Sequence, residues 1–362
     1  MKAERKISKV CYVLSYRDPK YIRTKTMVRA LQSLEGIELM TAINRSRGWW
    51  RYLETLWQLV GIRFRDNPDC YVLGFRGHEI FWFVRWISYH KFLVFDSLVS
   101  PYAALSEERK YGRWGWLVSK ALYRMEYAIL HQADVVVTDT QRHVDFLCDT
   151  FSLSGEKVIS VPVGADEGRW AQSCIGENDR FNVLFYGTFL PLHGVMTILD
   201  AALLLRDKPI YFTLIGGGGR HLSEFNSKMP ATGLPHVRHI PWVPFDDLIE
   251  CHIPQADLCL GGPFGHTPQA NRVITGKTWQ CLSMGKATVV GEILEPETGF
   301  VDRENCLLVP QGDATALAES LAWAEQNREL LPQIGQKGFL LYQTRYSVAC
   351  LAERLQKIFS LC

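Results

Sequence analysis

The sequence predicts an α/β protein built from two Rossmann-like, doubly wound domains in series. The chain has 362 residues, of which 47% are hydrophobic and 22% charged, enough apolar material for two cores. Short apolar runs alternate with helical stretches along the chain, as in parallel sheets with crossover helices. A polar stretch without a clear period, residues 164–182, separates two such series and is the predicted linker.

Each half contains its own set of candidate strands. Those of the first half are residues 9–14, 38–42, 70–73, 92–95, 135–137 and 158–161. Those of the second half are residues 183–186, 210–215, 237–240, 258–260 and 288–290. The last helix is predicted at 349–359, because Leu351, Leu355 and Phe359 share one face. The expected domains are therefore 1–165 and 166–345, followed by a C-terminal helix within 346–362.

The charge is unevenly distributed, although the formal net charge is only +2. Residues 1–130 contain 22 basic and 12 acidic residues, whereas the remainder contains 18 and 26. A basic half suits a polyanion such as lipid headgroups, a phosphorylated lipid or nucleic acid. No nucleic-acid-binding motif accompanies these charges, so nucleic acid is not the expected partner.

Cysteine spacing and apolar run lengths indicate the cellular compartment. The ten cysteines form no C-x-x-C pair, so we expect no metal site. No apolar run is long enough for a transmembrane helix, and the charged residues 1–9 do not resemble a signal peptide. We therefore expect a cytoplasmic protein with reduced thiols.

Residues 45–65 predict a helix that is both aromatic and basic. Its large apolar residues share one helical stripe, and arginines flank the stripe. The apolar residues are Trp49, Leu53, Leu56, Trp57, Val60 and Phe64, and the arginines are Arg45, Arg47, Arg51, Arg63 and Arg65. The stripe either packs on the sheet or contacts an anionic membrane, which would make the protein peripheral at the inner face of the cytoplasmic membrane.

Two loops of the second half have the composition of a ligand site, because they follow strands where open α/β sheets bind ligands. Gly187, Thr188 and His193 lie directly before a helix, whose free N–H groups and dipole favour a phosphate. The four glycines at 216–219 allow a ligand to approach the backbone closely. Their spacing differs from the dinucleotide-binding fingerprint, so a dehydrogenase is not predicted.

A third loop places two cations before a helix. Arg272 and Lys277 precede an apolar helix that ends at Gly285, a typical C-terminal glycine. Two cations at the start of a helix suit a diphosphate leaving group. This loop is the strongest candidate for the reaction centre.

Four segments resemble the GT-B glycosyltransferases of the retaining family-4 type, the group 1 glycosyl transferases. Residues 277–289 (KTWQCLSMGKATV) resemble the K-x-x-E-A-x-A-x-G-K-P-V segment of that family. Residues 161–166 (VPVGAD) resemble V-P-x-G-x-D, Gly187-Thr188 resembles the G-[RT] donor loop, and 307–313 resemble L-V-x-x-x-D. The similarity covers most of residues 135–362.

The resemblance implies two domains that face a cleft, with the final helix packing back on the first domain. It implies a nucleoside-diphosphate sugar as donor substrate on the second domain, with no separate cofactor and no metal. By position, Lys277 and Arg272 would hold the diphosphate, and Gln280 replaces the glutamate that binds the ribose hydroxyls. The residues expected to flank the base are Gly216, Gly217, Gly218, Trp242 and Val243.

Two residues of the first domain are candidates for handling the acceptor. His78 and Asp96 each follow a predicted strand, so both loops are expected at the ligand-binding edge of the sheet. His78 would orient or deprotonate a hydroxyl, and Asp96 stands where the family commonly has a histidine near the transferred sugar. The chain departs from the family in its paired glutamates, eight residues apart, which are replaced by Arg272 and Gln280.

The prediction is thus a retaining, metal-independent glycosyltransferase of polysaccharide biosynthesis. Its acceptor is expected to be a hydroxyl of a lipid-linked or cell-envelope glycan. Two alternatives remain open. One is a GT-B-like enzyme without a glycan acceptor, a nucleotide-sugar epimerase or a phosphorylase. The other is a catalytically degenerate subunit that binds a nucleotide or a partner, which the missing glutamates favour.

Overall fold

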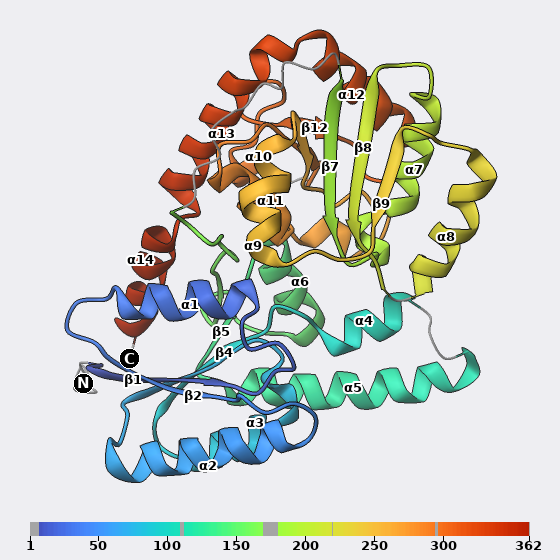
Figure 1. The fold of residues 1–362 in the computed structure, drawn as a ribbon. Helices are drawn as coiled ribbons and strands as arrows, with labels where there is room; N and C mark the ends of the chain where they lie inside the picture. Colours follow the sequence, from blue (N-terminus) through green and yellow to red (C-terminus); the bar gives the residue numbers. More distant parts are fainter. Residues whose placement is uncertain (1–6, 109–111, 169–179, 219, 294–295, 362) are drawn as a thin grey trace. The chain divides into compact units, whose positions relative to one another are not determined.

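A computed structural model describes residues 7–108, 112–168, 180–218, 220–293 and 296–361. The chain divides into two compact units, one of residues 1–164 with 348–362 and one of residues 165–347. Each unit is a parallel six-stranded sheet covered by helices (Figure 1). The predicted fold class is confirmed, including the final helix, which belongs to the first unit. Residues 169–179 of the predicted linker lie outside the described residues.

The first sheet has the strand order β2-β1-β3-β4-β5-β6, with every pair parallel. Its strands are β1 (Lys9–Leu14), β2 (Glu38–Ile43), β3 (Cys70–Leu73), β4 (Phe92–Asp96), β5 (Val135–Thr138) and β6 (Val158–Ser160). The chain moves to one side of β1 to form β2 and then to the other side to form β3. The ligand-binding edge therefore centres on the carboxyl ends of β1 and β3.

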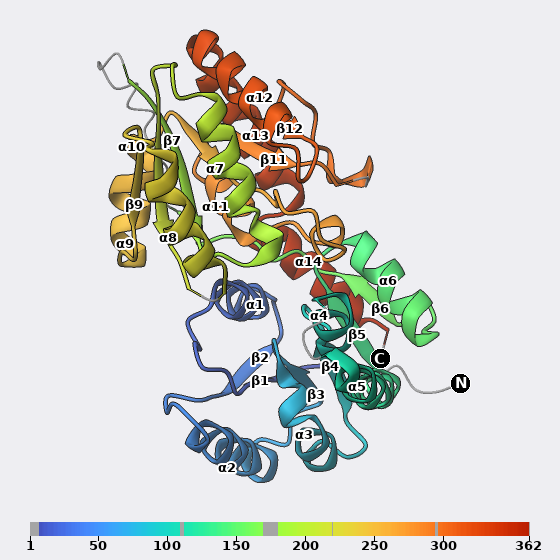
Figure 2. The same ribbon diagram turned by 90° about the vertical axis from the view of Figure 1, so that its right-hand side faces the viewer.

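Helices cover both faces of the first sheet (Figures 1 and 2). Helices α1 (Ile22–Gln32) and α14 (Val348–Phe359) share an apolar cluster on one face. The other face is covered by α2 (Trp50–Arg65), α3 (Phe81–Ile87), α5 (Gly112–Gln132) and α6 (Gln141–Phe151). The short helix α4 (Pro101–Glu108) precedes α5 in the chain.

The second sheet has the strand order β12-β11-β10-β7-β8-β9, again entirely parallel. Its strands are β7 (Phe181–Gly187), β8 (Ile210–Gly216), β9 (Val237–Ile240), β10 (Leu258–Leu260), β11 (Thr288–Gly291) and β12 (Leu307–Val309). This is the dinucleotide-fold order, in which the winding reverses between β7 and β10. The carboxyl ends of these two strands are therefore the expected ligand-binding point.

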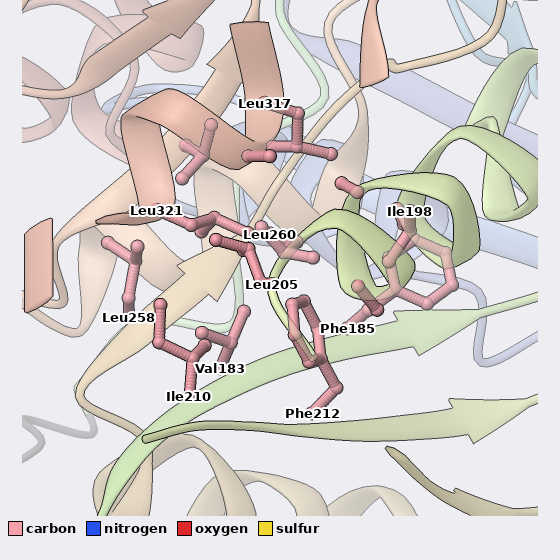
Figure 3. Packing of buried hydrophobic residues seen from close by; sticks show 14 of the residues in the cluster. Val183, Phe185, Ile198, Leu205, Ile210, Phe212, Leu258, Leu260, Leu317 and Leu321 are labelled. Carbon is pink, nitrogen blue, oxygen red and sulfur yellow. The ribbon is translucent and has the colours of Figure 1, made fainter. Parts of the chain in front are cut away.

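The core of the second unit explains why β7 and β8 are rich in apolar residues. Ile198 from α7 (Val195–Leu204) and Leu317 from α12 (Ala314–Gln326) meet the buried side chains of these strands (Figure 3). Further helices complete the two layers: α8 (Arg220–Thr232), α9 (Phe245–Asp247), α10 (Ile253–Gln255), α11 (Gly276–Ser283) and α13 (Leu331–Arg345). The apolar runs of these strands thus follow from burial on both faces of the sheet.

Helix α2 packs on the first sheet mainly through other residues than those of its aromatic stripe. Its sheet-facing side is formed by Thr55, Leu59 and Ile62, and the Thr55 hydroxyl donates a hydrogen bond of 3.0 Å to the Leu14 carbonyl. Trp57 and Phe64 are 82% and 85% exposed, so the alternative in which the aromatic stripe packs on the sheet is wrong for them. The sequence showed the helical period but not which of two apolar faces would be buried.

Candidate active site

The loop after β7 returns sharply into α7 through a short 3₁₀ turn, η2 (Pro191–His193). Gly194 ends this turn with φ of 63°, and a Cβ there would lie 2.3 Å from the backbone carbon of Phe264. Only glycine fits this position, because the added atom would overlap backbone. The turn therefore brings residues 187–193 close to the loop that follows β10.

The glycine loop after β8 lies directly beside the end of β7. Gly187 and Gly216 are partners in the sheet register, and the Gly217 N–H donates to the Gly187 carbonyl at 3.2 Å. Gly216, Gly217 and Gly218 have φ values of 116°, 145° and 100°, where side chains are strained. The His239 ring nitrogen Nε2 donates to the Gly216 carbonyl at 2.8 Å and fixes the loop from β9. The fourth glycine, Gly219, lies outside the described residues.

Helix α11 begins at the carboxyl end of β10. Thr275 caps it by accepting a hydrogen bond from the Thr278 N–H, and its hydroxyl donates to the Gly261 carbonyl at 2.6 Å. A Cβ on Gly261 would lie 2.6 Å from the Thr278 hydroxyl oxygen. The close packing of strand end and helix start places the N-terminus of α11 at the winding reversal of the sheet.

Lys277 occupies the first turn of α11 and points at the end of β7. Its side chain is 7% exposed, and the ammonium lies 5.3 Å from the ring centroid of Phe185. A Cβ on Gly187 would lie 3.6 Å from Nζ, so the ammonium rests against the backbone of this glycine. Within the described residues this ammonium makes no ion pair and no hydrogen bond to the protein.

Two pKa shifts follow from this packing. Burial lowers the pKa of Lys277 to about 7. Burial and the neighbouring Lys277 charge lower the pKa of His193 to about 3, so its imidazole is neutral at pH 7. The neutral ring donates its Nδ1–H to the Thr188 carbonyl. His193 therefore shapes the loop and supplies no positive charge.

The other predicted donor-site residues of the second unit differ in exposure. Arg272 ends the short turn η4 (Ala270–Arg272) before α11 and is partly exposed. Gln280 is buried, its Oε1 accepts from the Asp166 N–H at 2.9 Å, and its Nε2 donates to the Asp166 carbonyl at 3.4 Å. Trp242 is exposed and Val243 is half-buried, both after β9. The ribose contact of Gln280 and the base contacts of Trp242 and Val243 stay predictions.

In the first unit, Asp96 has a different environment from the predicted one. Its two carboxylate oxygens accept from Nε and Nη2 of Arg23 at 2.9 and 3.1 Å, and neither side chain is exposed. The same guanidinium donates to the carbonyls of Val161 and Pro162. The prediction that Asp96 orients the acceptor is therefore corrected, because its carboxylate is buried and ties β4 to α1.

His78 lies in a short turn, η1 (Gly77–Glu79), directly after β3 and at the winding reversal of the first sheet. Its ring meets Phe95 edge to face, with 4.9 Å between centroids. Nε2 is buried and has no hydrogen-bond partner among the described residues. Burial, followed by the Arg76 charge, lowers the pKa of His78 to about 3. With so low a pKa, the imidazole is too weak a base to deprotonate a hydroxyl at pH 7, and the predicted role of His78 in orienting an acceptor stays a prediction.

Several residues that define the site have no motif of their own. Arg23, which holds Asp96, and Phe185, which lies under Lys277, look like ordinary helix and strand positions in the sequence. Thr275, by contrast, directly precedes the apolar helix, and a threonine in that position is a common N-cap. This pattern would have located the start of α11 in the sequence. No group of three His, Cys, Asp or Glu side chains suited to a metal ion occurs within the described ranges.

Comparisons with known proteins agree with this architecture. Residues 180–327 match the family model for glycosyl transferases group 1. No curated protein sequence matches the chain significantly. Anabaena Alr3699/HepE, solved with UDP and glucose, aligns with a TM-score of 0.70 at 13% identity over 98% of this chain and 100% of its own.

Two further solved structures share the fold. The sucrose-phosphate synthase of Thermosynechococcus elongatus aligns with a TM-score of 0.68 at 14% identity over 98% of both chains. A mutant of S. aureus TarM, solved with fondaparinux, alpha-GlcNAc-glycerol and UDP, aligns with a TM-score of 0.62 at 13% identity, over 84% of this chain and 59% of its own. The chain therefore has the two-domain GT-B fold of these structures, and its residues 180–327 match the glycosyl transferases group 1 family.

Proposed function

We propose that the chain transfers a glycosyl group from a nucleoside-diphosphate sugar to a hydroxyl of a glycan acceptor. The observation that supports this most is the buried Lys277 ammonium, held against Gly187 without an anionic partner in the described part of the chain. A buried unpaired charge is costly, and an anionic ligand offsets that cost. A diphosphate that binds there would also meet the free N–H groups of the α11 N-terminus.

The proposed donor is a uridine or related nucleoside diphosphate sugar. UDP occupies solved structures of both HepE and TarM, which supports a donor of this class. The backbone of the glycine loop is open at Gly218, because a Cβ there would meet nothing within 4 Å. An extended diphosphate therefore has room along this loop.

The proposed reaction proceeds with retention of the anomeric configuration and without a metal ion. The bond from the anomeric carbon to the diphosphate oxygen breaks, and a bond to the acceptor oxygen forms on the same face. The acceptor proton passes to the leaving diphosphate, which Lys277, Arg272 and the α11 N-terminus stabilise. His78, neutral and with Nε2 unpartnered, accepts a hydrogen bond from an acceptor hydroxyl and orients it.

The proposed acceptor is a lipid-linked or cell-envelope glycan, presented at a membrane surface. The basic first 130 residues support this choice, as do the exposed aromatic side chains of α2. None of the helices within the described ranges combines the length and apolarity of a membrane span.

The donor proposal is tested by thermal unfolding of the full chain with UDP, GDP, ADP, CMP and dTDP. A ligand at about 100 times its dissociation constant stabilises by about 2.7 kcal/mol. We expect one nucleoside diphosphate to stabilise the wild type and the matched control Lys208→Met, an exposed lysine of the same unit, but not Lys277→Met. Stabilisation of Lys277→Met to the wild-type extent would refute the assigned site.

The reaction class is tested by following the nucleotide sugar itself. A transferase releases the nucleoside diphosphate in proportion to acceptor, and chelation of divalent ions leaves the rate unchanged. Conversion of the sugar nucleotide without acceptor would instead identify an epimerase. Nucleotide binding without turnover on any acceptor would identify a degenerate binding subunit.

A further inference from the structure

The outward side of α2 is apolar, which is the reverse of an ordinary surface helix. Trp50, Leu53, Trp57 and Phe64 follow one another at spacings of three, four and seven residues, which places them on one face. The opposite face, with Leu59, is buried on the sheet. A helix that covers a sheet normally turns a polar face to water. Here both faces are apolar, and the outer one has no covering element among the described residues.

Helix α3 repeats this arrangement beside α2. Phe81 and Val84 pack into the same apolar cluster as Leu59 of α2, while Trp82 and Trp86 are exposed. The two helices lie side by side on one face of the sheet (Figure 2), and Arg63 Nε of α2 donates to the Ile87 carbonyl at 3.1 Å. Since each helix buries its inner side on the same sheet face, both exposed stripes point away from it in the same direction.

We define the aromatic face as Trp50, Leu53, Trp57 and Phe64 of α2 with Trp82 and Trp86 of α3. Trp86 is 77% exposed, close to the values of Trp57 and Phe64. Such a concentration of large apolar side chains on one surface marks an interaction site in a folded protein. The face consists of two helix ridges rather than a groove, so it is suited to a broad surface more than to an inserted peptide.

The charges beside the aromatic face determine which surface it suits. Residues 45–66 contain five arginines and two carboxylates. One of these carboxylates, Glu54, accepts hydrogen bonds from the N–H groups of Arg45 and Ser46 at 2.7 to 3.0 Å, which holds the basic loop at the start of α2. Arg45 and Arg47 are therefore presented at one end of the stripe. At the other end the exposed Arg65 follows Phe64 and forms an ion pair of 2.9 Å with the second carboxylate, Asp66.

We propose that the aromatic face inserts into the headgroup region of an anionic lipid bilayer, with two helices lying in the plane of the membrane. Tryptophan prefers the bilayer interface, because its ring is apolar and its indole N–H is polar. Arginines at both ends of the stripe would meet lipid phosphates. This inference rests on the proposed function, because a lipid-linked acceptor would explain why the enzyme binds a membrane. The membrane contact itself requires only residues of the first unit.

The contact is tested by flotation of the full chain with two kinds of vesicles, phosphatidylcholine alone and phosphatidylcholine with phosphatidylglycerol. We expect the wild type to float with the anionic vesicles at low salt and less at high salt. Trp57→Ser/Trp86→Ser should bind at least about tenfold more weakly, a difference of about 1.4 kcal/mol. Arg45→Gln/Arg47→Gln should lose the preference for anionic vesicles while keeping part of the binding.

The matched control is Leu204→Ser/Leu340→Ser, which removes two exposed leucines of the second unit and should float like the wild type. Nucleotide-induced stabilisation should be unchanged in all these variants, so loss of flotation is distinguishable from failure of the donor site. The proposal is overturned if the wild type does not float with anionic vesicles, or if Trp57→Ser/Trp86→Ser floats equally well. It is also overturned if the face instead joins two copies, seen as a dimer that this variant converts to a monomer.

Discussion

Arg23 donates hydrogen bonds to both carboxylate oxygens of Asp96, and neither side chain is exposed to solvent. The pair joins α1 to the end of β4, positions that are 73 residues apart in the sequence. Through Nη1 the same guanidinium also holds the carbonyls of Val161 and Pro162, just beyond β6. One side chain thus fixes three segments of the first unit at the ligand-binding edge of its sheet.

Asp96→Asn is expected to destabilise the first unit by about 3–5 kcal/mol, because it leaves the Arg23 charge buried without its counter-ion. Urea unfolding followed by circular dichroism measures this loss. The control Asp207→Asn breaks an exposed pair with Arg206 and should cost less than about 1 kcal/mol. An Asp96→Asn protein with normal stability but no transferase activity would contradict the structural role and restore the catalytic one.

Nucleotide affinity is expected to fall as the pH rises above 7. Burial lowers the pKa of Lys277 to about 7, and a diphosphate prefers the ammonium form. Well above that pH the affinity should approach a loss of about tenfold per pH unit, the limit for a single proton. Calorimetric titration between pH 7 and 9 measures this slope and should also detect proton uptake on binding.

The matched variant Lys277→Met has no proton to lose at this position. Its weaker binding should therefore depend little on pH over the same range. An equally steep slope in Lys277→Met would show that another group titrates and would remove the assignment of the slope to Lys277.

Two alanine substitutions in the glycine loop after β8 are expected to differ in their effect on nucleotide binding. A Cβ on Gly216 would lie 2.2 Å from the Gly187 carbonyl oxygen, a backbone atom that cannot yield without moving the end of β7. We expect Gly216→Ala to weaken nucleotide binding by at least about tenfold, or about 1.4 kcal/mol. At Gly218 the added atom would meet nothing, so Gly218→Ala introduces strain at positive φ without the clash. Equal effects of the two substitutions in a binding titration would argue against the close approach.

Glu126 of α5 is expected to make the stability of the first unit depend on pH. It accepts hydrogen bonds from the Ser100 hydroxyl and the Tyr102 N–H at the start of α4, and burial raises its pKa to about 7 from an ordinary 4.5. The folded state therefore binds the proton more tightly than the unfolded state. The stability that Glu126 contributes to the folded state is fully present below pH 4.5 and is lost as the pH rises through 7.

Glu126→Gln should lack this pH-dependent component, which amounts to about 3 kcal/mol at most. Unfolding in urea at pH 5 and pH 8 gives the comparison, with the exposed Glu319→Gln as a control that should keep the wild-type pH dependence. If Glu126→Gln loses the same stability between these pH values as the wild type, the buried carboxyl is not the titrating group.

The sheets were largely predictable because their inner strands are buried on both sides. The apolar run of β1 was predicted at its observed limits, Lys9–Leu14, and β9 and β10 were likewise predicted in full. Strand β12, Leu307–Val309, was not predicted as a strand, because its residues were assigned only to a segment that resembles the family. Helix α2 begins at Trp50, since the basic loop before it is held by Glu54 rather than by helical hydrogen bonds.

The site was predictable where local chemistry defines it and not where distant residues meet. The cation before a helix identified the position of Lys277, and the structure shows its burial against Gly187. The role of Asp96 depends on Arg23, which no local pattern connects to it. The exposure of Trp57 depends on which of two apolar faces of α2 meets the sheet, a choice made by Thr55, Leu59 and Ile62.

The last helix of the chain has a consequence for biosynthesis. Leu351, Leu355 and Ile358 of α14 belong to the same apolar cluster as Val10 and Met27, so one face of the first sheet is built from both ends of the sequence. On the ribosome that face is covered by α1 but not by α14 until the residues up to Phe359 have emerged. The second unit, contiguous in the sequence, has no such dependence and can be completed first. We therefore expect the second unit to be complete before the first.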